Sequence, residues 1–234
     1  MEYTHKPVLL KECLDGLGIK PDGIYMDGTL GRAGHSLEIV RRLTTGRLIA
    51  IDRDQAALDA APERLAGYMD KVTLVRGNFG GLTEILARLG VSGVDGMLFD
   101  LGVSSPQLDD GSRGFSYLQD AALDMRMDQS APLTARDVVN GWSREELRRI
   151  LWEYGEERYA GLIAAAIVRE REQALIETTG QLAELIRSAM PAKARREKQH
   201  PAKRSFQAIR IAINDELGEV ERLLDSALDA LNPG

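Results

Sequence analysis

The chain has 234 residues, a net charge of −6, one cysteine and three histidines. A lone cysteine cannot form an internal disulfide, and so few Cys and His side chains argue against a zinc site, so no metal is expected. No apolar run is long enough to span a membrane, and the first residues lack the basic start and apolar stretch of a signal peptide. These features favour a cytoplasmic protein without a membrane partner.

The first half of the chain alternates strand-like and helix-like segments. Short apolar runs predict four strands, at residues 23–27, 46–52, 72–75 and 94–101. Helical spacing of apolar residues predicts helices between them, at residues 36–43, 55–69 and 82–89. This order is typical of an α/β fold with a doubly wound parallel sheet.

The second half contains mainly helical patterns. Residues 109–205 hold helix candidates at 135–139, 144–154, 159–173 and 179–189, and residues 205–231 predict one long amphipathic helix. We therefore expect an α/β core formed by residues 1–108 and 206–234. Residues 109–205 are expected to form an inserted helical domain that recognises the substrate.

A glycine-rich loop follows the first predicted strand. Asp27 precedes Gly28, Gly31 and Gly34, whose spacing differs from the G-x-G-x-x-G of nicotinamide-binding loops. A carboxylate at Asp27 would repel a pyrophosphate but suits the ammonium group of S-adenosylmethionine, and Asp52 ends the second strand where it can accept ribose hydroxyls. The loop therefore favours S-adenosylmethionine. A nicotinamide oxidoreductase and a tight turn with a capping acid remain the alternatives.

Residues 193–210 form a basic segment in an otherwise acidic chain. Its one acid is Glu197, and its cations are Lys193, Arg195, Arg196, Lys198, Lys203, Arg204 and Arg210. Such a segment indicates phosphate binding, with a solvated surface as the alternative.

Several motifs recur in a fixed order along the chain. They are D-G-T-L-G-R-A-G-H-S at 27–36, A-I-D-R-D at 50–54, D-L-G-V-S-S-P-Q-L-D at 100–109 and H-P-A-K-R-S-F-Q-A-I-R at 200–210. Shorter matches are R-G-F-S at 113–116, L-D-M-R-M-D at 123–128 and Y-G-E-E-R at 154–158. From residue 5 to residue 234 the chain resembles the bacterial 16S ribosomal RNA cytosine-N4-methyltransferases, the MraW or RsmH family.

The resemblance implies a Rossmann-like methyltransferase core that binds S-adenosyl-L-methionine and acts on 16S ribosomal RNA or the small ribosomal subunit. With the loop residues Asp27 and Gly31, the implied cofactor contacts are Ala33, Gly34, His35, Asp52, Phe79, Asp100 and Gln107. Ala33 departs from the family, which commonly has glycine there. We expect its methyl group to be tolerated if φ is negative and to narrow the loop otherwise.

The segment after the fourth strand is the expected catalytic region. An exocyclic amine is a weak nucleophile because its lone pair is delocalised into the ring. The enzyme must therefore orient the amine and accept hydrogen bonds from its N–H groups. We assign this task to Asp100, Ser104 and Ser105, with an ordinary turn as the alternative. Cys13 is far from these motifs in sequence, which disfavours a cysteine adduct.

The RNA contacts are expected in the insert and the basic segment. Phosphates would be held by Lys203, Arg204 and Arg113. The target base must leave the RNA stack, and Phe115 or Tyr117 would then stack on a base. The alternative for the aromatic residues is burial inside the insert.

The resemblance implies further strands after residue 234. With the family's sheet pattern, we therefore expect the strand order 3-2-1-4, with the fourth strand at an open edge, where self-association is a hazard. The second hypothesis for function is a catalytically inactive RNA-binding remnant that retains the cofactor loop.

Overall fold

The computed structural model describes residues 7–233, and the chain divides into two compact units. Unit 1 comprises residues 1–104 and 217–234, and unit 2 comprises residues 105–216. Residues 105–108 and 206–216 thus belong to the helical unit, whereas the sequence-based division assigned them to the core.

Unit 1 contains a parallel sheet with the predicted strand order. The strands described are β1 (Ile24–Asp27), β2 (Arg47–Asp52), β3 (Val72–Arg76) and β4 (Gly96–Leu98), arranged as β3-β2-β1-β4. Asp27 lies opposite Ala50 on one side and Leu98 on the other. The α/β fold class and the order 3-2-1-4 are confirmed, and the carboxyl ends of β1 and β2 meet at one edge.

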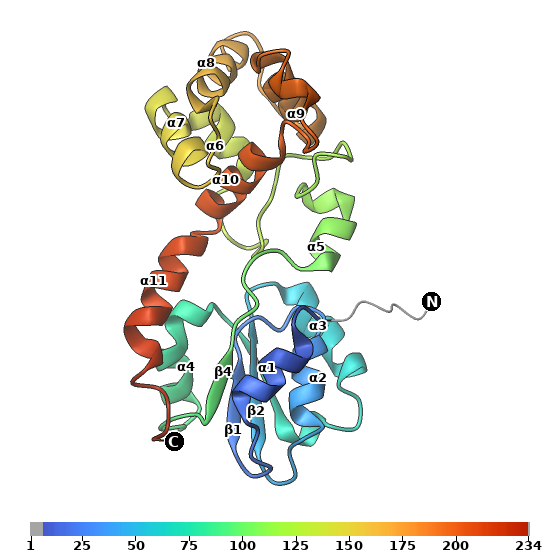
Figure 1. Ribbon diagram of the computed structural model, residues 1–234, viewed down its shortest axis with the longest axis vertical. Coiled ribbons are helices and arrows are strands. Elements are labelled where there is room, and N and C mark those ends of the chain that lie inside the picture. The colour runs from blue at the N-terminus through green and yellow to red at the C-terminus, as the bar shows by residue number, and fades with distance from the viewer. Residues whose placement is uncertain (1–6, 234) are drawn as a thin grey trace. The chain divides into compact units, whose positions relative to one another are not determined.

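Helices cover both faces of this sheet (Figure 1). Leu14 in α1 (Leu10–Leu17), Ile39 in α2 (Gly34–Val40) and Leu58 in α3 (Gln55–Arg64) pack with Tyr25 and Leu48. On the opposite face, α4 (Leu82–Arg88) and α11 (Glu216–Ala227) pack with Met26 and Ile49, and the short turns η1 (Met69–Lys71) and η2 (Phe79–Gly81) flank β3. Because neighbouring strand residues point to opposite faces, the continuous apolar runs supply both cores.

The fourth strand is shorter than expected. The prediction of residues 94–101 was wrong in length, because Val94 pairs with Leu231 in an isolated parallel bridge and the chain leaves the sheet after Leu98. The Val94 N–H donates to the Ala230 carbonyl at 2.9 Å, and Asn232 N–H donates to the Val94 carbonyl at 2.9 Å. Within residues 7–233, β4 itself has β1 as its strand neighbour, so its other edge is unpaired.

Unit 2 is helical, and local sequence signals start several of its helices. Its elements are α5 (Ser105–Asp109), η3 (Gly111–Arg113), α6 (Ala135–Gly141), α7 (Arg144–Glu153), α8 (Ala160–Arg171), α9 (Thr179–Ala189), η4 (Ala194–Arg196) and α10 (Lys203–Ile213). Reciprocal capping boxes begin α6 at Thr134, α7 at Ser143 and α9 at Thr178. Each box satisfies N–H groups that a helix start leaves without partners.

The predicted single helix over residues 205–231 is wrong. It is interrupted between α10 and α11, where Asp215 has φ of 48°. The buried Asn214 side chain accepts a hydrogen bond from Met127 N–H at 2.8 Å and donates to the Met125 carbonyl at 2.9 Å. These contacts hold the end of α10 within unit 2, whereas Leu223 of α11 is buried in unit 1. The expected packing on the sheet therefore holds for α11 alone.

Candidate functional site

The glycine-rich loop after β1 makes a tight turn against two aromatic rings. A Cβ at Gly28 would meet the Phe99 ring at 2.1 Å and the Phe79 Cβ at 3.2 Å. Leu30 N–H donates to the Ile51 carbonyl at 2.9 Å, which ties the loop to β2. Gly31 has φ of 48°, a conformation that glycine adopts without steric cost. The loop is thus held close to the end of β2.

Asp27 lies inside this turn. Its side chain is 1% exposed and accepts hydrogen bonds from Thr29 N–H at 3.0 Å and from the Ser36 hydroxyl at 2.6 Å. Burial raises the pKa of Asp27, against the lowering effect of these hydrogen bonds. Asp27 therefore holds the loop to the start of α2 through these hydrogen bonds. The sequence had suggested contact with an ammonium group instead.

Asp52 is more accessible and ends β2 beside the loop. One carboxylate oxygen accepts Gly31 N–H at 2.8 Å, and the other accepts Asp54 N–H at 2.9 Å. Burial is the main cause that raises the pKa of Asp52. Each oxygen has a second lone pair, and the residue is only half-buried, so the carboxylate can also accept hydroxyl groups from a ligand.

Two phenylalanines form an aromatic wall at the ends of β3 and β4. Phe79 and Phe99 are half-buried and contact edge to face, with ring centroids 5.6 Å apart. The side-chain oxygen of the preceding Asn78 is buried without a hydrogen-bond partner among the described residues. Apolar rings beside an unsatisfied acceptor suit a flat, nitrogen-rich ring that carries an amino group. Sequence reasoning missed Asn78 and Phe99, although both follow strand ends.

The start of α2 is packed against the chain just before α1. A Cβ at Gly34 would meet Pro7 at 2.5 Å, and His35 Nε2 lies 3.0 Å from the Val8 carbonyl. Ala33 is fully buried with φ of 57°. The Ala33 methyl group was expected to be tolerated if φ is negative, and this condition is not met. A residue with a side chain is strained at positive φ.

The segment after β4 reaches the same edge of unit 1. Asp100 N–H donates to the Thr29 hydroxyl at 2.6 Å, and the Asp100 side chain is exposed. Its charge contributes to raising the pKa of Asp27, which follows from their closeness. Ser104 is the last residue of this part of unit 1, whereas Ser105 and Gln107 lie in α5 of unit 2.

Two predicted RNA contacts lie in the interior of unit 2. Arg113 is 7% exposed, and its guanidinium donates to the carbonyls of Arg126 at 2.9 Å and Met127 at 3.1 Å. Phe115 is 6% exposed and lies beneath that guanidinium. An RNA contact requires accessible atoms, so the expectation for Arg113 and Phe115 is corrected to a structural role.

The basic segment, in contrast, lies on the surface of unit 2. Lys203 is exposed at the start of α10, and Arg204 is half-buried with one nitrogen donating to the Glu156 carbonyl at 3.0 Å. Four further cations are exposed, namely Lys193, Arg195, Arg196 and Lys198. Lys203 is therefore available to a phosphate, while Arg204 also anchors the helix.

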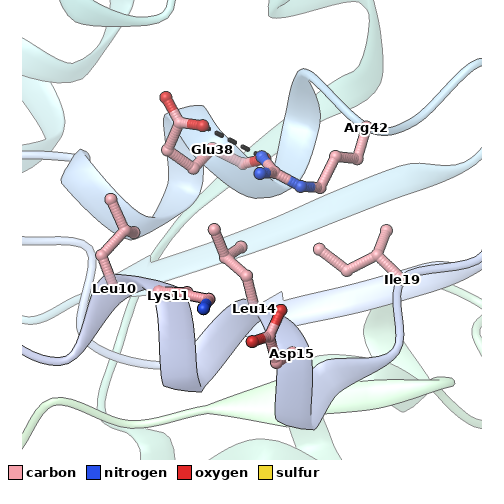
Figure 2. Close-up of a pocket in the computed structure, with 7 residues that line it drawn as sticks. All are labelled: Leu10, Lys11, Leu14, Asp15, Ile19, Glu38 and Arg42. Carbon is pink, nitrogen blue, oxygen red and sulfur yellow. Dashed lines mark hydrogen bonds and ion pairs between the residues drawn. The ribbon is translucent and has the colours of Figure 1, made fainter.

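A separate groove of about 370 Å³ lies between α1 and α2 (Figure 2). Its lining contains both apolar and charged side chains, namely Leu10, Lys11, Leu14, Asp15, Ile19, Glu38 and Arg42. Arg42 is paired with Glu38 at 2.9 Å on the α2 side of the groove. None of the predicted site residues lines this groove.

Two further properties concern residues 7–233 only. They contain no group of three or more His, Cys, Asp or Glu side chains arranged to hold a metal ion. No helix among them combines the length and apolarity that crossing a membrane requires.

The chain was compared with known proteins. The model of the MraW methylase family matches residues 2–234. Ribosomal RNA small subunit methyltransferase H of Brevibacillus brevis is 58% identical over all of this chain and 74% of its own length. Proteins of the same name from a Paenibacillus species and from Symbiobacterium thermophilum are 59% and 56% identical, and the matches span 76% and 74% of their lengths.

Proposed function

The chain belongs to the MraW methylase family, and from this premise we propose that it methylates the N4 amino group of a cytosine in 16S ribosomal RNA, with S-adenosylmethionine as methyl donor. The observation that carries the proposal is the family match over residues 2–234. The names of relatives at 56–59% identity supply the RNA substrate. A nicotinamide oxidoreductase is disfavoured on the same ground.

The residues at the edge of the sheet fit this cofactor. Asp52 would accept ribose hydroxyls, and Phe79 with Phe99 would contact the adenine, whose amino group matches the unsatisfied oxygen of Asn78. Asp27 and His35 would act indirectly by holding the loop residues Gly31, Ala33 and Gly34 in place. When bound, S-adenosylmethionine supplies an electrophilic methyl group on a sulfonium.

Asp100 is the residue best placed to handle the amine. Its backbone is fixed by Thr29 while its carboxylate stays exposed. The carboxylate can therefore accept a hydrogen bond from the N–H of the cytosine amino group. The hydrogen bond would draw electron density onto nitrogen as the new N–C bond forms, the methyl–sulfur bond would break to leave a neutral thioether, and the carboxylate would take up the proton that nitrogen must lose. Ser104 and Ser105 would orient the base from the same segment.

Lys203 and Arg204 would hold RNA phosphates. Lys203→Ala is expected to reduce the slope of log affinity against log salt by about 0.7, the contribution of one phosphate contact to single-stranded nucleic acid. Affinity for S-adenosylmethionine should stay the same. An unchanged salt slope in the folded variant would show that Lys203 is only a solvated surface residue.

Methyl transfer provides the decisive test. Small subunits that lack the modification are incubated with the protein and S-adenosylmethionine labelled in its methyl group, and the modified nucleoside is identified by mass spectrometry. We expect N4-methylcytidine from the wild type and a rate lower by about 100-fold or more from Asp100→Asn, in line with the loss of a general acid–base group. Cofactor binding without any transfer would favour the inactive RNA-binding remnant.

A further inference from the structure

Two rings from distant parts of the sequence stack face to face in unit 2. Tyr117 and His200 have ring centroids 4.5 Å apart and planes inclined by 13°. Phe206 of α10 contacts Tyr117 edge to face, with centroids 5.6 Å apart. His200 Nδ1 accepts a hydrogen bond from Ala202 N–H at 3.2 Å, so the ring is held in a defined orientation with its proton on Nε2.

This pair is supported from below and open to solvent. Phe206 is buried beneath it, whereas Tyr117 and His200 are both half-buried. Partial burial is the main cause that lowers the pKa of His200, and the charge of Arg187 adds to it, which favours the neutral form of the ring. A neutral aromatic surface on a fixed support is what a nucleobase needs in order to stack.

The surroundings of the pair are cationic. His200 lies within the basic segment, which carries exposed Lys193, Arg196, Lys198 and Lys203 and the single acid Glu197. Single-stranded RNA is bound by positive charges that follow its phosphates and by aromatic rings on which its bases stack. The basic segment and the ring pair bring these charges and rings together. They suit single-stranded RNA, because the bases of a duplex are stacked on one another and are not available to a protein ring.

We propose that the Tyr117–His200 pair is a stacking platform for one base of single-stranded RNA, with the exposed cations of the basic segment on the neighbouring phosphates. The proposal rests on the proposed function and adds the residues of unit 2 that contact an unpaired base of the RNA. Of the two aromatic residues that the sequence suggested, it keeps Tyr117 and leaves out Phe115, which is buried, and it adds His200.

The test separates base stacking from phosphate binding. Fluorescence anisotropy of the full chain measures affinity for a labelled RNA hexamer of uridines and for the same backbone without bases. His200→Ala should weaken binding to the uridine hexamer by about fivefold or more, the lower end of what one stacked base contributes. Its affinity for the abasic backbone should not change. His200→Phe, which also lacks the Nδ1 acceptor, should restore binding because it restores the ring.

A charge variant provides the matched control. Lys198→Ala should weaken binding to both hexamers equally and lower the salt slope by about 0.7. An equal loss on both hexamers from His200→Ala would overturn the proposal by showing that the ring only shapes the segment, and no loss on either would overturn it as well. If the hexamer measurements contradict the stacking proposal while methyl transfer to small subunits is intact, the proposed function is unaffected.

Discussion

Asp27 and Asp52 are both aspartates that end a strand of the same sheet, yet their side chains have different surroundings. Both carboxylate oxygens of Asp27 bind the chain itself, and the residue is buried. The oxygens of Asp52 each accept one backbone N–H, and the residue remains half-buried. The difference arises because Ser36, at the start of α2, reaches Asp27 and has no counterpart at Asp52.

Replacing Asp52 should affect the cofactor more than the fold. Asp52→Ala is expected to weaken binding of S-adenosylmethionine by at least tenfold, because hydrogen bonds to a charged group contribute about 1.5–3 kcal/mol each. Isothermal titration calorimetry measures the affinity, and circular dichroism checks that the variant is folded. A folded variant with wild-type affinity would remove Asp52 from the site.

Ala33 should be a point of strain. Its φ of 57° costs a residue other than glycine roughly 1–2 kcal/mol, part of which the flexibility of glycine in the unfolded chain offsets. Ala33→Gly is therefore expected to stabilise unit 1 by about 0.5–1 kcal/mol in urea unfolding followed by circular dichroism. Ala33→Val should destabilise it, because a β-branched residue tolerates this conformation poorly. Equal stability of all three proteins would contradict the strain.

At the scale of elements, the break between α10 and α11 depends on side-chain contacts that the apolar spacing does not show. The apolar spacing of residues 205–231 continues through the break, so the pattern alone predicts one helix. Asn214 instead binds backbone groups of Met125 and Met127, and Arg210 pairs with Glu216 at 2.7 Å across the break. These contacts favour two shorter helices over a continuous one.

Removing the Asn214 side chain should destabilise unit 2. Asn214→Ala leaves the Met127 N–H and the Met125 carbonyl without this partner in a buried place, which costs about 2–4 kcal/mol for the two groups together. Both tryptophans, Trp142 and Trp152, lie in unit 2, so urea unfolding followed by tryptophan fluorescence reports on it.

Asp215→Gly is the control next to it. This residue has φ of 48°, which glycine adopts without steric cost, so Asp215→Gly should destabilise unit 2 less than Asn214→Ala does. If Asn214→Ala proved as stable as the wild type, the side chain would not be what holds the end of α10.

At the scale of the whole molecule, Asp27 and Asp52 of unit 1 and the capping-box carboxylates of unit 2 respond to acid in opposite ways. In unit 1, burial raises the pKa values of Asp27 and Asp52. In unit 2, the Thr134 hydroxyl lowers the pKa of Asp137, and the Ser143 hydroxyl lowers that of Glu146. These last two carboxylates belong to the capping boxes of α6 and α7.

The signs follow from proton binding. A raised pKa means that folded unit 1 binds protons more tightly than the unfolded chain, so these two groups add stability as pH falls towards the ordinary value of 3.8. Lowered pKa values give unit 2 stability that is present above the ordinary values of 3.8 and 4.5 and is lost as pH falls below them. Acidification should therefore weaken unit 2 first.

This order can be measured with the tryptophans of unit 2. The urea midpoint from tryptophan fluorescence is expected to fall below about pH 4.5, while hydrogen exchange, corrected for its intrinsic pH dependence, should show protection in β1 and β2 lost only at lower pH. Glu146→Gln keeps the side-chain oxygen of the capping box without its charge and should flatten the acid dependence of the midpoint. Loss of protection in unit 1 before unit 2 would contradict the assignment.

The sequence by itself determined the features that depend on neighbours in the chain. Apolar runs and helical spacing predicted the four strands of the parallel sheet, and the family resemblance added their order. Ser or Thr followed by an acid or Gln three residues later starts helices α6, α7 and α9. Ordered motifs predicted the family. The loop glycines and the exposed Lys203 were also found this way, because turns and charge runs are written in adjacent residues.

Only the tertiary structure decided which polar and aromatic side chains are buried. Asn214 meets its partners 87 and 89 residues away, and Arg113 and Phe115 lie inside unit 2 although their sequence resembles a surface motif. Helices α1 and α5 were not predicted, and β4 was predicted too long. The limits of these elements depend on packing and on backbone pairing with distant residues, such as the β-bridge of Val94 with Leu231. Burial is set by segments that fold back from far along the chain, and their approach leaves no periodic signal in the local sequence.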